Sequence, residues 1–410
     1  MAPALPVEAM TIPETIAYNG SLYHVVTDAS KAVSARLSVT RLKPLQIQGN
    51  FYLKNSHPRT WVLHSPHSGD NTQLRALAAA LGWPCESKRL SYRRQEGLLR
   101  VLSLPTLAGV DLAASSPIEA PWPDLVICSG RGAEAVAFWL KQQNPHLRIV
   151  FVGTPWSGLS RFDLVITTPQ YRLPQAPNVL HNLLPLHDVT PDRLSAETVR
   201  WQPRLGTLPR PFTALLVGGA SGPYLFTPAS ARRLGREASA VARAAGGSLL
   251  VTTSARTGDA AADALQSAID VPCFFHRWQS DAPDNPFHAV LGLADRIIVT
   301  ADSISMMSEA VSTGKPVLLF DIEEGPYAMR ADAGRPRIGW RGRSANASIF
   351  RLLINHAPPR FSRDLRVVHH QLVTSGRAQW LGDPPAKASP LPLEDALARA
   401  VARIRGLFGL

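Results

Sequence analysis

The amino-acid sequence predicts an α/β protein with two Rossmann-like, doubly wound domains, and three observations lead to this prediction. From residue 60 onward, short apolar runs end in loops containing Gly, Ser and Asp, and Ala/Leu/Arg-rich stretches with helical spacing follow them. This βα alternation is typical of a parallel sheet. A Pro-rich stretch at residues 185–211 interrupts the alternation, which then restarts. The length of 410 residues also exceeds the roughly 100–200 residues of a usual single domain.

In the first half of the chain, residues 1–57 show no clear periodicity and are assigned as an N-terminal extension of unclear structure. Residues 58–200 form the predicted first domain. Its expected strands are TWVLH, PDLVIC, RIVFV and FDLVIT, and the stretches QLRALAAALG and AEAVAFWLKQQ are its expected helices. Residues 185–211 show neither a helix nor a strand period, and we interpret them as an interdomain connection.

The predicted second domain covers residues 201–384, with strands TALLV, SLLVTT, VPCFFH, RIIVT and KPVLLF. Thr227 followed by Pro228 is typical of a helix cap and first helical position. Residues 385–410 are expected to form an amphipathic helix with its apolar side chains on one face. Two roles remain open for this tail, docking on an anionic membrane or a structural clasp across both domains.

Composition excludes several classes of protein. With 45% hydrophobic and 18% charged residues the chain can bury sizeable cores, so it is not mostly disordered. No apolar run approaches the roughly 18 residues of a membrane span. The amino terminus lacks a basic start followed by an apolar stretch, so we expect no targeting peptide. The 3 cysteines are far apart, which favours a reducing, cytoplasmic location over a disulfide framework.

The charge balance favours anionic partners, since 43 Lys and Arg residues stand against 31 Asp and Glu residues, a net charge of +12. Nucleic acid is not the expected partner, because the basic residues are dispersed without interleaved aromatic side chains. Brief peripheral contact with the inner membrane face fits the charge, since each basic residue adds up to ~1 kcal/mol at an anionic lipid surface.

The glycine-rich turn after TALLV is the first candidate site. Gly218, Gly219 and Ser221 follow a predicted strand, and glycines at such a point let backbone amides approach a phosphate. Ligands of doubly wound sheets bind beyond the carboxyl ends of the strands, so this turn should line a cleft. The alternative is a tight strand-to-helix turn that binds no ligand.

The segment RIIVTADSISMMSEAVSTGKPVLLF carries the sharpest signal. A helix is expected to begin near Ser303 and to end at Gly314. Its amino end favours a diphosphate through free amides and the helix dipole, with the Ser303 and Ser305 hydroxyls as further donors. Glu309, one to two turns into the helix, can accept hydrogen bonds from two ribose hydroxyls, each typically worth ~1.5 to 3 kcal/mol.

A structural interpretation of the same segment remains open. Asp302 or Ser303 could simply cap the helix, and Glu309 could lie on its solvated face. Met306 belongs to the candidate nucleotide-sugar-binding segment, although packing is the more ordinary role of a methionine at this position.

Three other kinds of site are weakened by residue spacing. Lys315 precedes Pro316 rather than Ser or Thr, which argues against a Walker loop and an ATPase. The turn Gly130-Arg131-Gly132 lacks the acidic residue expected about 20 positions later, so NAD is not expected. The sequence contains no Asp-x-Asp, His-Glu-x-x-His or Cys-x-x-Cys motif, and we therefore expect no metal and no cofactor.

The first domain offers candidate catalytic residues in the loop after TWVLH. His67 or Asp70 could act as general base toward a hydroxyl nucleophile, with His64 and Asn71 beside them. In the alternative interpretation Asp70 caps a helix at residues 73–81 and the histidines are solvated.

Further candidates in the second domain follow the strands SLLVTT and VPCFFH. Arg256 could neutralise a leaving diphosphate, and Arg277 and Trp278 could border a base. Each has a structural alternative, since a loop arginine is often only exposed and Trp278 could belong to the core.

Several of these motifs occur in a fixed order. SGDNTQ, FDLVITTPQY with PNVL, LLVGGASG, TTSARTG, DNPF and VTADSISMMSEAVSTGKPV all lie within residues 60–322, the extent of the similarity described next. Together they resemble the plant mitochondrial-fission "elongated mitochondria" family and its bacterial homologues, which is in turn similar to GT-B glycosyltransferases. The resemblance implies two facing Rossmann-like domains and a nucleotide-sugar held mainly by the second. It also implies ribose and diphosphate roles for Ser303, Ser305 and Glu309, and a position near phosphate for Gly219 and Ser221.

The resemblance leads to a functional expectation. We expect a metal-independent GT-B glycosyltransferase that moves a sugar from a nucleoside diphosphate to a hydroxyl of a lipid-linked or cell-surface glycan. Alternatives are a nucleotide-sugar 2-epimerase and a non-enzymatic, membrane-associated fission or scaffold protein. The sugar, the base and the stereochemical course are not encoded in any motif that we recognise.

Overall fold

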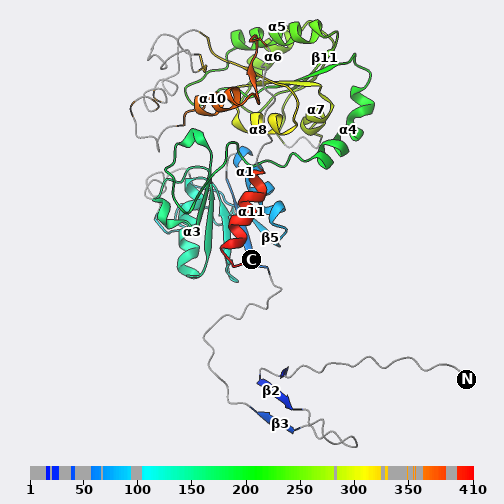
Figure 1. The fold of residues 1–410 in the computed structure, drawn as a ribbon. Helices are drawn as coiled ribbons and strands as arrows, with labels where there is room; N and C mark the ends of the chain where they lie inside the picture. The colour runs from blue at the N-terminus through cyan, green and yellow to red at the C-terminus, as the bar shows by residue number, and fades with distance from the viewer. Residues whose placement is uncertain are drawn as a thin grey trace, which may run out of the picture. The chain divides into compact units, whose positions relative to one another are not determined.

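The computed structural model describes residues 15–18, 21–26, 38–41, 57–65, 68–93, 104–280, 284–324, 328–330, 349, 354, 356, 363–384 and 395–410. The chain separates into two compact units, Met1–Ser56 and His57–Leu410. In the first unit, strands β1 (Thr15–Tyr18), β2 (Ser21–Val26) and β3 (Ser38–Arg41) form an antiparallel sheet in that order (Figure 1).

The second unit contains two parallel sheets. The first has the strand order β5-β4-β6-β7-β8-β9. Strands β4, β6, β7 and β8 are apolar runs buried on both faces, as expected of parallel strands, whereas the edge strand β5 is polar and mostly exposed. Its strands are β4 (Thr60–His64), β5 (Cys85–Arg89), β6 (Leu125–Cys128), β7 (Arg148–Val152), β8 (Leu164–Thr167) and β9 (Val179–His181). Helices α1 (Ser68–Leu81) and α3 (Arg131–Gln143) and the 3₁₀ turns η1 (Leu159–Arg161) and η2 (Pro169–Tyr171) complete this domain.

The second sheet has the order β12-β11-β10-β13-β14-β15, which is the Rossmann order 3-2-1-4-5-6. Its strands are β10 (Phe212–Leu216), β11 (Ser248–Thr252), β12 (Cys273–His276), β13 (Arg296–Thr300), β14 (Val317–Phe320) and β15 (Gln379–Trp380). Its helices are α5 (Pro228–Ala244), α6 (Asp259–Ser267), α7 (Phe287–Leu293), α8 (Ile304–Ser312) and α10 (Arg366–Thr374). Helices α5 and α6 cover one face, and α7 and α8 cover the other (Figure 1). The predicted α/β class with two doubly wound, Rossmann-like domains is confirmed.

The connection between the two sheets corrects one expectation, because it contains a helix, α4 (Pro191–Leu205). Thr190 caps this helix by accepting a hydrogen bond from the Arg193 amide at 3.2 Å. Only Trp201 and Leu205 of the helix are buried, and they pack into the core of the second domain. The surrounding stretch is rich in proline and Pro203 lies inside the helix, so its sequence resembles a loop.

The carboxyl-terminal helix α11 (Ala396–Gly406) packs against the first domain, beside α1 (Figure 1). Ala400 and Ile404 are fully buried there, with Leu397 and Val401 partly buried around them. The apolar face of this helix is therefore used inside the protein, against the first domain rather than across both domains. Among the helices of the described residues, none has the length and apolar character needed to span a bilayer.

Candidate functional site

The strand order of the second sheet places two loops together. Strands β10 and β13 are parallel neighbours, and the strands that follow each of them in the chain lie on opposite sides of this pair. A crevice is therefore expected beyond the carboxyl ends of β10 and β13. The predicted glycine turn follows β10, and the predicted helix α8 follows β13. The two motifs therefore meet at one edge of the sheet, although they are far apart in the sequence.

The glycine turn serves a different purpose from the one expected. The Gly218 amide donates to Thr300 Oγ1 at 2.8 Å, and the Gly219 amide donates to Asp302 Oδ2 at 2.9 Å. A Cβ atom on Gly218 would lie 2.3 Å from Asp302 Oδ2, so the close approach of this carboxylate requires glycine. Both amides are used within the protein, which corrects the expectation that they face a ligand phosphate. The Ser221 amide likewise donates to the carbonyl of Tyr224, at 3.0 Å.

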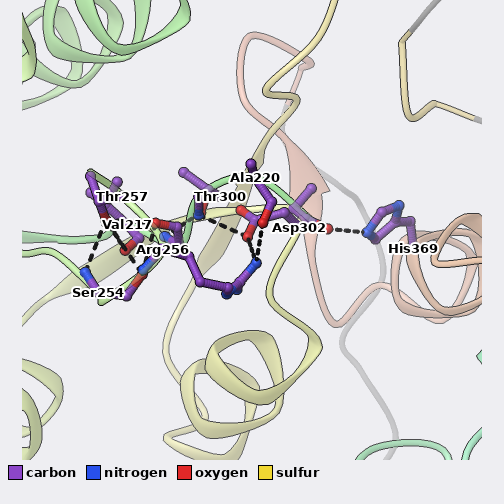
Figure 2. Close-up of polar contacts among 11 residues, drawn as sticks. Val217, Ala220, Ser254, Arg256, Thr257, Thr300, Asp302 and His369 are labelled. Atoms are coloured by element: carbon purple, nitrogen blue, oxygen red, sulfur yellow. Dashed lines mark hydrogen bonds and ion pairs between the residues drawn. The ribbon is translucent and has the colours of Figure 1, made fainter. Parts of the chain in front are cut away.

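Asp302 is a buried carboxyl group at the centre of this edge. Its side chain is fully buried, and Arg256 Nη1 lies 2.8 Å from Asp302 Oδ2 (Figure 2). Burial raises the pKa of Asp302, while the Arg256 charge and the Gly219 amide oppose that rise. Arg256 Nη1 also donates to the Ala220 carbonyl at 3.2 Å, and 41% of the arginine side chain is exposed.

One threonine and one serine hydroxyl hold the turn that carries Arg256 against the end of β10. Neither residue was identified as a candidate from the sequence. Thr257 Oγ1 donates to the Gly218 carbonyl at 2.6 Å, and Ser254 Oγ donates to the same carbonyl at 2.8 Å. Both residues belong to the TTSARTG motif, which was the available signal. The turn that carries Arg256 is therefore fixed to the glycine turn.

The buried His369 of α10 contacts the loop between β13 and α8. Its Nε2 atom lies 2.6 Å from the Ala301 carbonyl oxygen. Figure 2 shows His369 pointing from its helix toward the segment that carries Asp302. Burial lowers the pKa of His369 to about 4, so the ring is neutral near pH 7 and Nε2 carries the proton that it donates. No sequence motif indicated this residue.

The amino end of α8 has free donors. Ser303 occupies the cap position, but its side chain makes no capping bond. Among the described residues, no acceptor contacts the amides of Ile304, Ser305 or Met306, which are the first three of the helix. Ser305 and Met306 are half-buried, and Met306 packs partly against the core, as its ordinary role predicts.

Glu309 lies one turn further along α8 and is 7% exposed, so it is not a solvated face residue. Burial raises the pKa of Glu309 to about 8, with a further contribution from the Asp188 charge and an opposing one from Arg193. In the part of the chain that the structure describes, the Glu309 carboxyl has no hydrogen-bonding partner, and its oxygens keep slight solvent access. Ser305 and Glu309 are four residues apart and therefore share one face of the helix.

The two candidate residues that follow β12, Arg277 and Trp278, have different surroundings. Arg277 turns to α6, where Nη2 contacts Asp263 at 2.5 Å and Nη1 lies 3.8 Å from Asp259. Trp278 is 43% exposed and so lies outside the core, and its amide donates to Thr253 Oγ1 at 2.8 Å. The exposed indole remains a candidate surface for a base, whereas the Arg277 guanidinium is engaged with helix α6.

In the first domain, His67 lies outside the described residues. Asp70 is in the first turn of α1, which begins at Ser68, and its carboxylate accepts a hydrogen bond from Ser65 Oγ at 2.9 Å. Asn71 holds the same serine through its backbone, since Oδ1 accepts from the Ser65 amide and Nδ2 donates to the Ser65 carbonyl, both at 2.8 Å. Burial lowers the pKa of the neighbouring His64.

Glu134 of α3 is a further residue that the sequence did not indicate. The carboxylate is fully buried and accepts three hydrogen bonds, from the Trp156 amide at 2.6 Å, the Ser157 amide at 3.0 Å and Ser157 Oγ at 2.7 Å. It fixes the loop after β7. Within the described residues, no group of three or more His, Cys, Asp or Glu side chains is arranged to hold a metal ion.

Comparisons with known proteins place most of this chain in one protein family. Residues 68–343 match the family model described as Mitochondrial fission ELM1. The mitochondrial fission protein ELM1 of Arabidopsis thaliana is 27% identical over 244 residues, which are 54% of this chain and 56% of that protein. An uncharacterized protein of Rickettsia prowazekii (strain Madrid E) is 24% identical over 294 residues, 63% of this chain and 82% of that protein. The matched region spans little more than half the length of the Arabidopsis relative.

Similar solved structures include UDP-N-acetylglucosamine 2-epimerase from Rickettsia bellii, with 11% identity, a TM-score of 0.44, and coverage of 86% of this chain and 96% of that one. ADP-heptose lps heptosyltransferase II of E. coli has 12% identity and a TM-score of 0.38, with coverage of 85% and 98%. The two strand orders, rather than these similarities, carry the fold assignment.

Proposed function

Because the chain belongs to the mitochondrial fission ELM1 family, we propose that it is a metal-independent GT-B glycosyltransferase. In this proposal the second domain binds a nucleoside-diphosphate sugar, and the sugar is transferred to a hydroxyl of a lipid-linked or cell-surface glycan. The donor would bind at the edge of the second sheet where β10 and β13 diverge.

The observation that carries the proposal is the Glu309 carboxyl. A largely buried carboxyl without a protein partner costs about 1–3 kcal/mol unless water or a ligand completes its hydrogen bonds. A ribose supplies two neighbouring hydroxyls, which can donate to the Glu309 carboxyl oxygens and, where the carboxyl is protonated, accept its proton. Ser305 lies on the same helix face as Glu309, one turn nearer the free amides at the start of α8.

The diphosphate would bind at the amides of Ile304, Ser305 and Met306 rather than at the glycine turn. A helix amino end favours an anion through its unpaired N–H groups and its dipole. The Gly218 and Gly219 amides are engaged with Thr300 and Asp302, so they do not contribute donors.

The acceptor hydroxyl must lose a proton during transfer, and Asp70 and His67 remain the candidate bases. Asp70 is half-buried at the carboxyl edge of the first sheet, where it already accepts the Ser65 hydroxyl. A base in this position would have to exchange that hydrogen bond for one from the acceptor.

The test measures binding of UDP, GDP and CMP sugars to the full chain by calorimetry, after a thermal-shift screen. For the nucleotide that binds, Glu309→Ala should weaken affinity at least about tenfold, since leaving the ribose hydroxyls without a partner in a buried site costs about 1–3 kcal/mol. The same nucleotide with a 2′-deoxyribose should bind more weakly to the wild type and be less sensitive to Glu309→Ala.

Glu237→Gln is the matched control, because Glu237 is an exposed carboxylate paired with Arg233 on α5. It should leave nucleotide affinity unchanged. If Glu309→Ala binds as tightly as the wild type, Glu309 has no ribose role and the proposed site is wrong. Product mass then separates transfer, which enlarges the acceptor, from 2-epimerisation, which leaves the donor mass unchanged.

A second candidate function has a specific observation in its favour. The Asp302 carboxylate sits against the glycine turn, where a phosphate-binding loop would hold its anion. A non-enzymatic fission or scaffold protein that kept the fold would show such an internal anion and no transfer. The absence of any nucleotide-dependent thermal shift would favour this function over a glycosyltransferase.

A further inference from the structure

We propose that Arg256 binds a phosphate group of the ligand and that the buried Asp302 is the positioning residue that holds the Arg256 guanidinium for this purpose. The inference rests on the proposed function for the identity of the anion, a nucleoside diphosphate. It assigns Asp302 no contact with the ligand, unlike the expectation from the sequence.

The backbone of Arg256 is fixed by its neighbours. A Cβ atom on Gly219 would lie 2.0 Å from the Arg256 carbonyl oxygen, so the two backbones are in direct contact. The Arg256 amide donates to Ser254 Oγ at 3.3 Å, and Ser254 Oγ itself donates to the Gly218 carbonyl. The arginine therefore starts from a backbone position that its own turn cannot easily change.

The side chain is held at its far end. Figure 2 shows Arg256 reaching from this turn to Asp302 and the Ala220 carbonyl. Both contacts that the described residues make with the guanidinium use Nη1, which leaves Nε and Nη2 as donors for an anion. An arginine held in this way loses less conformational freedom when it binds a ligand.

Asp302 could either position the Arg256 guanidinium or compete with the ligand for it, and the burial of the two side chains distinguishes these roles. The carboxylate is completely enclosed, whereas 41% of the arginine side chain is exposed. A ligand can therefore reach the guanidinium without displacing the carboxylate, which favours positioning over competition. Asp302 also lies two residues before the start of α8, so the guanidinium is beside the positive end of that helix.

Arg277 provides a contrast within the same domain. Its guanidinium also pairs with carboxylates, but Asp259 and Asp263 are 95% and 66% exposed. Exposed pairs of this kind are screened by solvent and hold a side chain only weakly. Of these two arginines, Arg256 alone is anchored by a buried group.

The experiment titrates inorganic pyrophosphate into the full-length protein by calorimetry and compares Arg256→Gln, Asp302→Asn and the double variant. We expect Arg256→Gln to weaken binding at least about tenfold and Asp302→Asn to weaken it about threefold or more. The double variant should be no weaker than Arg256→Gln alone, because Asp302 acts only through Arg256. Arg256→Lys should restore binding only in part, since it keeps the charge without the planar fork.

Arg243→Gln is the matched control, since Arg243 is an exposed arginine paired with Asp270 where α5 ends. It should bind pyrophosphate like the wild type. Unchanged binding in Arg256→Gln, or no binding of pyrophosphate by the wild type, would overturn the inference. Tighter binding in Asp302→Asn would also overturn it, by showing that the carboxylate competes with the ligand. If Asp302→Asn does not fold, Arg256→Gln and Arg256→Lys decide the role of the arginine.

This inference and the proposed function can fail separately. Pyrophosphate binding that depends on Arg256, with no nucleoside diphosphate bound more tightly, would refute the nucleotide-sugar site and leave an anion site. Nucleotide binding that depends on Glu309 but not on Arg256 would refute the present inference alone.

Discussion

The two sheets differ at the point where their central strands diverge. In the first sheet, between β4 and β6, Asp70 and Asn71 are both bonded to Ser65, and Glu134 of α3 accepts three hydrogen bonds. In the second sheet, between β10 and β13, Glu309 has no hydrogen bond among the described residues and Arg256 is partly exposed. At the first edge the Asp70, Asn71 and Glu134 side chains are bonded within the protein, whereas the second edge retains capacity for a ligand.

This difference separates structural from functional polar residues. A buried carboxylate with all its acceptors used fixes the surrounding backbone and gains nothing from a ligand. A buried carboxyl without partners raises the free energy of the folded state, and a ligand that supplies donors lowers it. Three experiments test whether Glu134 and Glu309 differ in this way and whether the two edges do.

The largest expected effect is a pH dependence of stability that comes from Glu309. Its folded pKa of about 8 exceeds the ordinary value of 4.5, so the folded state keeps a proton that the unfolded state releases between these pH values. The stability gained from this proton is present below pH 4.5 and is lost as pH rises through 8. Between about pH 5 and about pH 9, the free energy of unfolding of the wild type should fall by about 4 kcal/mol relative to Glu309→Gln.

Urea unfolding of both proteins across this pH range measures the difference, with Glu237→Gln as the control that should follow the wild type. Parallel pH curves for the wild type and Glu309→Gln would mean that Glu309 ionises at its ordinary pKa. The second edge would then resemble the first.

A smaller effect is expected at the glycines of the two edges. Gly219→Ala should lower the free energy of unfolding by about 3 kcal/mol, because the new methyl group would meet the Arg256 backbone at 2.0 Å. Gly69→Ala, in the first turn of α1, should have almost no effect, since no atom lies within 4 Å of its Cβ position. Equal stabilities in urea unfolding would show that the two turns at the second edge are not in tight contact.

The smallest of the three effects compares the same substitution at two buried sites. Glu134→Gln should cost about 2 kcal/mol, because an amide NH₂ would replace one acceptor oxygen and leave a donor unpaired. Glu309→Gln should be neutral or stabilising at about pH 7, since that carboxyl makes no hydrogen bond to lose. A similar loss of stability in both variants would contradict the proposed difference between the edges.

The sequence predicted the parts of the fold that depend on local pattern. The apolar runs became the strands of two parallel sheets, and helix α8 begins after Ser303 and ends before Gly314 as its caps indicate. Helix α4 was missed because it lies in a Pro-rich stretch and has Pro203 inside it. Proline normally ends or kinks a helix, so the stretch resembles a loop.

The candidate site was predicted in part. The sequence placed Ser303, Ser305 and Glu309 on one helix at a strand end, since that inference needs only the order of strand, turn and helix. It assigned the glycine amides to a ligand, whereas the Asp302 carboxylate and the Thr300 hydroxyl accept them. Glu134 could not be recognised, because its three donors come from a loop that a different strand positions.

The sequence by itself therefore determined which segments are strands and helices and where polar residues follow them, because these properties depend on neighbours along the chain. Only the tertiary structure decided which polar groups meet. Gly219 and Asp302 are 83 positions apart and come together because β10 and β13 are adjacent. The raised pKa of Glu309 and the anchored guanidinium of Arg256 depend on how completely packing excludes water and which partners it supplies.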